Sequence, residues 1–195
     1  MQFHLSQIGR TGAHLLLDAL AREGVTRIHL PPGPLPIGVM MINRRVVIIG
    51  TSQTRLIGDV NLGDRARLRL EGLNVEGRLT VAGAAVFHAV DCDVGGGLAL
   101  GGDSTTILQR CALHNSADRV ALVASDRAKA SVEDSTLSGG NVVAILGPTA
   151  QVGFTRSHLA GLAVHDRHDP APDAHQQREG PRLPKLNRLY FFKGN

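Results

Sequence analysis

Four charged residues recur at regular intervals through the middle of the chain. Asp91, Arg110, Asp134 and Arg156 each stand directly before a cysteine or a serine. Two carboxylates held side by side could act as acid and base on a glycosidic bond or on an acidic sugar. The interleaved arginines would lower the carboxylate pKa values, whereas an acid catalyst needs a raised one. We therefore interpret these residues as a ladder of ion pairs on an exposed edge.

A second candidate cluster combines Asp93 with His88 and Asp91. Such a group could bind calcium or exchange protons with a substrate. Only one repeat of the chain supplies it, so a solvated corner is the preferred interpretation. If the protein is an enzyme, Asp91, Asp93 and Asp134 are the expected catalytic residues.

The remaining candidates for metal or cofactor chemistry are weaker. The histidines and aspartates of residues 165–169 lead directly into the sequence Pro170-Ala171-Pro172, which is typical of a linker. The three glycines of residues 95–97 lack the helix and the lysine of a phosphate-binding loop. Cys92 and Cys111 are expected to pack as two small inward thiols. We expect no metal and no cofactor.

These residues belong to an internal repeat. Its equivalent positions are Leu73, Cys92, Cys111, Ser135 and Ser157, at spacings of 19, 19, 24 and 22 residues. Each unit contains three short apolar strands with Gly, Asn, Asp or Ser at the corners, which is the pattern of one coil of a parallel β-solenoid. The sequence predicts an all-β solenoid of about five to six coils, whose inward columns take small and aliphatic residues and exclude bulky aromatic ones.

The N-terminal part has a different pattern. Thr11 is placed to cap a helix that runs to about Arg22, and Gly24 would end it. A strand over residues 26–30 and another over residues 46–49 follow. We therefore divide the chain into an N-terminal cap (1–44), a β-helix (45–166) and a linker with a C-terminal arm (167–195).

The N-terminal order of elements resembles that of pectin-lyase-like proteins. Members of this family open with a capping helix, a strand ending in a turn such as Leu30-Pro31-Pro32-Gly33, and an apolar strand such as Val47-Ile48-Ile49-Gly50. With the coils, the resemblance covers about residues 11–166 and implies a right-handed parallel β-helix. The family includes polysaccharide lyases, hydrolases, epimerases, virus tailspikes and non-catalytic shafts, so the resemblance implies no single activity.

Enzymes of this family usually carry catalytic groups on the outward side of the first strand of each coil. The corresponding residues here offer no acid, base or nucleophile: Thr80, Ala99, Ala121, Val143 (or Ala144) and Ala163. A small, apolar outward stripe of this kind indicates burial against another subunit. We expect these residues to form an oligomer interface.

Composition excludes several classes of protein. The chain has 195 residues, six of them aromatic, and a net charge of +4. Six basic and three acidic residues fall within residues 167–195, so the rest is almost neutral, which disfavours a nucleic-acid surface. No apolar run is long enough to cross a membrane. No signal peptide is visible, so a virion or a cytoplasmic location before assembly is expected.

The C-terminal segment concentrates apolar and aromatic side chains after a polar linker. Its apolar residues include Leu186, Leu189, Tyr190, Phe191 and Phe192. Such a segment is typical of an arm that docks on a neighbouring subunit or folds back over the open end of its own solenoid. The two alternatives are equally compatible with the sequence.

Together these features favour a non-catalytic structural or adhesive module. The resemblance suggests a homotrimeric virion component, such as a tailspike-like, fibre or head-decoration protein. Its partners would be further copies and other structural proteins of an assembly, with a glycan as a further ligand and neither nucleic acid nor membrane insertion. The alternatives are a small carbohydrate-active enzyme, either a lyase or a hydrolase, and a polymerising cytosolic scaffold.

Overall fold

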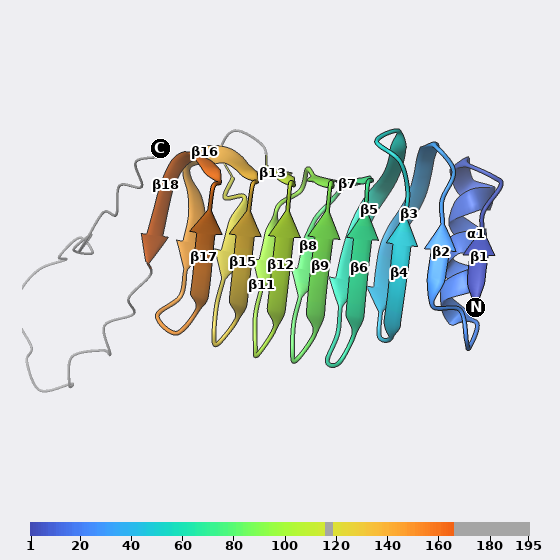
Figure 1. Ribbon diagram of the computed structural model, residues 1–195, viewed down its shortest axis with the longest axis horizontal. Coiled ribbons are helices and arrows are strands. Elements are labelled where there is room, and N and C mark those ends of the chain that lie inside the picture. The colour runs from blue at the N-terminus through green and yellow to red at the C-terminus, as the bar shows by residue number, and fades with distance from the viewer. Residues whose placement is uncertain (116–118, 166–195) are drawn as a thin grey trace, which may run out of the picture.

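The structure, a computed structural model, describes residues 1–115 and 119–165. The chain winds into a parallel β-solenoid of about seven turns, with one short helix near the N-terminus (Figure 1). The all-β solenoid predicted from the repeats is confirmed. It has one or two turns more than expected, because strands already stack in parallel within residues 1–44.

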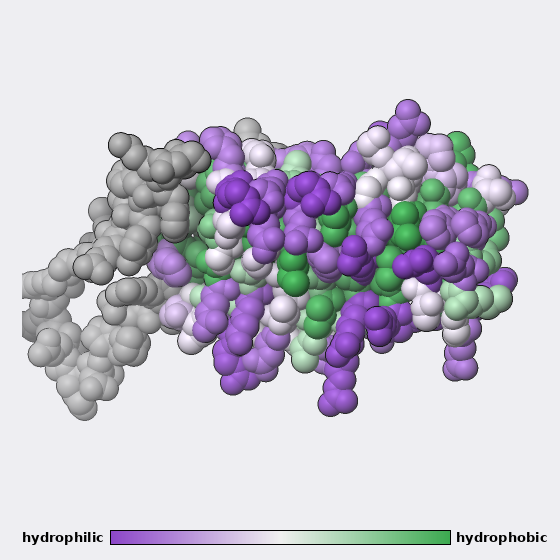
Figure 2. Space-filling view, viewed as in Figure 1, coloured by the Kyte–Doolittle hydropathy of each residue, from purple (hydrophilic) through white to green (hydrophobic). Residues whose placement is uncertain are grey.

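One wall of the solenoid is an eight-stranded sheet, which faces the viewer in Figures 1 and 2. Hydrophilic side chains gather along both edges of its outer face (Figure 2). Its neighbouring strands pair in parallel. The strands are β1 (Gln2–His4), β2 (Arg27–His29), β4 (Arg45–Ile49), β6 (Arg67–Glu71), β9 (Val86–Val90), β12 (Thr105–Gln109), β15 (Lys129–Glu133) and β17 (Gln151–Thr155).

The other strands form a ten-stranded sheet that folds around the opposite side of the core. They are β3 (Gly33–Ile42), β5 (Thr54–Leu62), β7 (Asn74–Glu76), β8 (Leu79–Val81), β10 (Asp93–Val94), β11 (Leu98–Leu100), β13 (Ala112–His114), β14 (Leu122–Ala124), β16 (Thr136–Leu146) and β18 (His158–His165). A corner divides this sheet into two faces. Strands β7, β10 and β13 lie on one face, and β8, β11 and β14 lie on the other.

Stacked glycines form that corner. An added Cβ at Gly58, Gly77 or Gly96 would lie within 2.2 Å of the backbone of the glycine one coil earlier. No side chain fits into such a gap, so the corner requires glycine in these coils. We call Gly38, Gly58, Gly77 and Gly96 the glycine corner.

The N-terminal helix closes one end of the core. Helix α1 (Gly9–Ala21) packs on β3 and buries Leu16 and Ala19. It begins two residues before the predicted Thr11, and the residue at its N-cap, Ile8, makes no side-chain capping bond. The expected Thr11 cap is therefore wrong, because Thr11 lies inside the first turn.

Arg44 fastens the end of this helix to the solenoid. Its Nη1 atom donates to the carbonyl oxygens of Leu20 at 2.9 Å and Arg22 at 2.5 Å, and its Nη2 atom donates to the carbonyl of Val25. The last carbonyls of a helix have no partner within the helix. Arg44 satisfies carbonyls at and after the end of α1 and links them to the start of β4.

The expected boundary at residue 44 falls inside the stack. Strand β2 pairs with β4, and β3 pairs with β5 along nearly its whole length. Pro34 and Pro36 argue against a strand at β3 in the sequence. The structure places β3 at the edge of its sheet, where proline is tolerated. The N-terminal segment is thus the first part of the solenoid.

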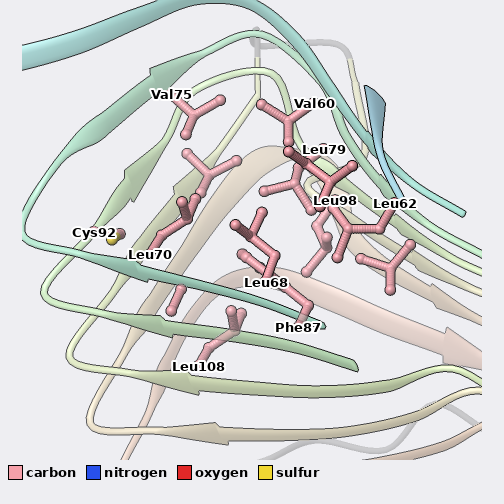
Figure 3. Packing of buried hydrophobic residues seen from close by; sticks show 14 of the residues in the cluster. Val60, Leu62, Leu68, Leu70, Val75, Leu79, Phe87, Cys92, Leu98 and Leu108 are labelled. Atoms are coloured by element: carbon pink, nitrogen blue, oxygen red, sulfur yellow. The ribbon is translucent and has the colours of Figure 1, made fainter. Parts of the chain in front are cut away.

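Inward side chains stack in columns along the core (Figure 3). Phe87 is fully buried between Leu68 and Thr106 of the neighbouring strands. The expectation that the columns exclude aromatic rings is therefore wrong at this coil. The column accommodates Phe87 beside two neighbours of different size, the larger Leu68 on one side and the smaller Thr106 on the other.

Candidate functional site

The four charged residues of the predicted ladder lie at one corner of successive coils. Asp91, Arg110, Asp134 and Arg156 all have left-handed backbone conformations, with φ between 48° and 54°. Gly72 occupies the same corner one coil earlier, with φ of 67°. This conformation turns the chain from the eight-stranded sheet into the next strand and leaves the side chains on the outside.

The ladder consists of two ion pairs that join neighbouring coils. The Nε and Nη2 atoms of Arg110 donate to the two carboxylate oxygens of Asp91 at 2.7 and 2.8 Å. Arg156 contacts Asp134 in the same way at 2.6 and 2.8 Å. The hydrogen bonds from these guanidinium groups lower the pKa of both carboxyl groups. The expected ion pairs are therefore present, and neither carboxyl group is suited to donate a proton near neutral pH.

Asp93, His88 and Asp91 do not form the proposed cluster. His88 lies on β9 in the eight-stranded sheet, whereas Asp93 lies on β10 in the other sheet. Asp93 instead approaches His114, with 2.7 Å between its Oδ1 atom and the Nε2 atom of the histidine. Within residues 1–115 and 119–165, no three His, Cys, Asp or Glu side chains gather as a metal site would require.

The outward stripe exists, but part of it was assigned to the wrong residues. The strand register aligns Thr80 and Ala99 with Val123, Ile145 and Val164. We call these five residues the outward stripe; all are half-buried.

Two predicted members of the stripe, Ala121 and Val143, are fully buried. The predicted Ala163 pairs with Ala144, the alternative to Val143, and Ala144 is also fully buried. The error has a simple cause. The coils that follow Cys111 and Ser135 are longer than the first two, so counting from these residues misplaces the outward positions.

A chain of polar contacts crosses the outer face of the eight-stranded sheet, and the sequence analysis did not predict it. Arg69 Nε donates to Glu71 at 2.5 Å, and the Nη1 atom of Arg69 lies 3.4 Å from His88 Nδ1. His88 Nε2 lies 3.1 Å from the Oε1 atom of Gln109, whose Nε2 atom donates to Glu133 at 3.1 Å. The contacts join β6, β9, β12 and β15. We call this the polar chain.

Glu133 ends the polar chain as an ionised acceptor. Hydrogen bonds from Gln109 and from the Ser131 hydroxyl lower the pKa of its carboxyl group. A general acid would need the opposite shift. The polar chain is therefore suited to binding neighbouring coils together or to contacting a polar partner. Aligning the third strand of each repeat would have shown that these residues share a face.

The two cysteines are free, buried and in neighbouring coils. Their Sγ atoms each donate to a backbone carbonyl at 3.3 Å, from Cys92 to Val90 and from Cys111 to Gln109. The adjacent Cys111 thiol and burial raise the pKa of Cys92. The expected packing as two inward thiols is confirmed, and a protonated, buried Cys92 thiol makes a poor nucleophile.

The predicted docking residues, from Leu186 to Phe192, lie outside the described residues. In the part of the chain that the structure describes, no helix has the length and apolar character needed to cross a membrane.

Comparisons with protein-family models, with curated proteins and with solved structures found no match. What is shown is therefore the parallel β-solenoid itself.

Proposed function

We propose that this protein is a non-catalytic structural or adhesive β-helix module that assembles as a homotrimer. The outward stripe is the observation that carries the proposal. Four of its members, Ala99, Val123, Ile145 and Val164, form an unbroken small and apolar column over β11, β14, β16 and β18. A continuous apolar column on the outside of a solenoid is suited to contact with another subunit.

The three candidate catalytic carboxylates already contact basic side chains, which also favours a non-catalytic role. Asp91 and Asp134 are held by arginines, and Asp93 lies against His114. An enzyme of this fold would need an acid or a base that is free to exchange protons with a substrate. The resemblance to pectin-lyase-like proteins then favours the virion members of that family, such as tailspike-like, fibre or head-decoration proteins.

The C-terminal arm is the second part of the proposal. Core residues of the last coil, including Val152, Phe154 and Leu159, are only partly buried. The chain continues directly from this coil into residues 166–195, which contain the apolar segment ending at Phe192. We propose that this segment docks on the C-terminal coils of a neighbouring subunit.

Light scattering on Val123→Asp and Ile145→Asp variants tests the trimer. Each change places a charge in the outward stripe, so both variants should be monomers with an unchanged circular dichroism spectrum, whereas the wild-type protein should be a trimer. Ile107→Asp is the matched control, because Ile107 is half-buried on the outer face of the other sheet. The control should remain a trimer.

A monomeric wild-type protein would overturn the proposal, and open-ended growth would indicate the polymerising scaffold instead. The enzyme alternative is tested with a polysaccharide panel. Cleavage that disappears in Asp91→Ala or Asp134→Ala variants would show that the protein is a carbohydrate-active enzyme.

A further inference from the structure

Four arginines surround Val47 on the outer face of the eight-stranded sheet. In the strand register Arg45 lies beside Arg67, while Arg27 and Arg69 lie on either side of Val47. Neighbouring strands are about 4.8 Å apart and a two-residue step spans roughly 7 Å, so the four Cα atoms fall within about 10 by 7 Å. We call Arg27, Arg45, Arg67 and Arg69 the arginine patch.

Little negative charge balances this patch. Of these four arginines, only Arg69 forms an ion pair within the described residues, and its partner is Glu71. Arg45 and Arg67 are exposed and directly opposite each other, and like charges in this position destabilise a sheet. Strongly hydrophilic residues lie over β4 and β6 in Figure 2. The charge here is local, since most of the net charge of the chain comes from residues 167–195.

Apart from Glu71, the residues that flank the patch on the same face carry no negative charge. Ile49 and Val86 are apolar, and His88 belongs to the polar chain. Arg44, next to the patch in sequence, already donates to the carbonyls at the end of α1. The arginine patch is therefore a cationic surface whose repulsion an external anion would relieve.

We propose that the arginine patch binds a ligand that carries several linked phosphate or sulfate groups. A guanidinium group presents two parallel N–H donors to an oxyanion, which gives arginine its preference for phosphate and similar groups. Several such groups within about 10 Å suit a polyvalent anion better than a single ion. The outer faces of β2, β4 and β6 carry no Phe, Tyr or Trp for base stacking, which disfavours single-stranded nucleic acid.

Titration calorimetry of the full-length protein with inorganic tripolyphosphate tests the proposal. Tripolyphosphate should bind at least tenfold more tightly than orthophosphate, and its affinity should fall as salt is added. The Arg45→Gln/Arg67→Gln variant should lose at least tenfold in affinity. Its matched control is Arg55→Gln/Arg127→Gln, which removes the same formal charge from two ion-paired arginines elsewhere and should bind normally.

A second measurement separates lost binding from lost folding. Tripolyphosphate should raise the melting temperature of the wild-type protein and leave that of Arg45→Gln/Arg67→Gln unchanged, with similar circular dichroism spectra for both proteins. A parallel titration with heparin shows whether sulfate groups are accepted as well as phosphate. Unchanged affinity in the double variant, an equal loss in the control, or tighter binding of a single-stranded oligonucleotide that survives the substitutions would each overturn the proposal.

Discussion

Asp91 and its equivalents show how a backbone conformation sets the role of a side chain. Their left-handed φ values place them at an outside corner, where each carboxylate meets the guanidinium group of the next coil. The distance between coils suits this contact, because parallel strands are separated by about 4.8 Å. The corner therefore converts two potentially catalytic acids into links between coils.

These links predict a dependence of stability on pH. The arginines hold the pKa of Asp91 and Asp134 below the usual value near 3.9, so their contribution to stability is present above that pH and disappears as pH falls through the lowered pKa values. The Asp91→Asn/Asp134→Asn variant should melt slightly below the wild-type protein at pH 7, since solvent screens these exposed pairs. Thermal denaturation from pH 7 to pH 2.5 should show this difference shrinking below about pH 4.

Asp18→Asn provides the control, since Asp18 is exposed on α1 and has no ion-pair partner among the described residues. Its melting temperature should follow that of the wild-type protein at every pH. A gap between the wild-type protein and the double variant that stays constant down to pH 2.5 would rule out these pairs as its cause.

At the scale of elements, helix α1 depends on a residue outside it. Arg44 donates to the carbonyls of Leu20, Arg22 and Val25, and no other arginine of the described chain makes such contacts with α1. Losing a charged hydrogen bond inside a protein typically costs about 1.5–3 kcal/mol. Arg44 is thus a single side chain that holds the end of α1 in place over the core.

We predict that Arg44→Ala lowers the free energy of unfolding by about 2–3 kcal/mol. Urea denaturation followed by circular dichroism measures this change. Arg65→Ala removes an exposed arginine of the neighbouring coil and should change the free energy by less than about 0.5 kcal/mol. Equal effects of the two substitutions would show that the contacts of Arg44 contribute nothing specific.

The coil strands could be predicted because the same pattern recurs in each repeat. The first coils were missed because Pro34 and Pro36 interrupt the apolar alternation of β3. The outward stripe was partly misplaced because coil length changes after Cys111, and neither the longer coil nor its register is visible in a single repeat. The polar chain links residues such as His88 and Gln109, 21 positions apart, which become neighbours only when the register is known.

At the scale of the whole molecule, the solenoid formed by the described residues has two unlike ends. Helix α1 covers the core at the N-terminal end, whereas core residues of the last coil, such as Phe154 and Leu159, remain partly exposed. In the described residues, β17 and β18 are the last strands of their sheets, and a strand with a neighbour on one side only can pair with another chain. The difference between the ends supports placing the docking site of the proposed arm at the C-terminal coils.

Deletion of residues 183–195 should therefore convert the proposed trimer into monomers, because it removes the proposed aromatic anchors Tyr190, Phe191 and Phe192. Sedimentation velocity would measure the change, and circular dichroism would confirm that the solenoid remains folded. A Gln176→Ala/Gln177→Ala variant, altered in the polar linker alone, should stay trimeric. Unchanged assembly after the deletion would exclude the arm as a docking element.

The glycine corner also determines where the coil can accept additional sequence. Coils that keep Gly77 and Gly96 at this corner repeat every 19 residues, whereas the coil that begins at Cys111 takes 24. Its strands β13 and β14 are separated by residues 115–121 in the sequence, where only residues 95–97 separate β10 and β11. The strands on both sides keep their partners, since Ala112 pairs with Asp93 and Leu122 with Leu98. The connection between β13 and β14 therefore takes additional residues without a change in the pairing of its flanking strands, so a foreign peptide inserted there should leave the register of the neighbouring coils unchanged.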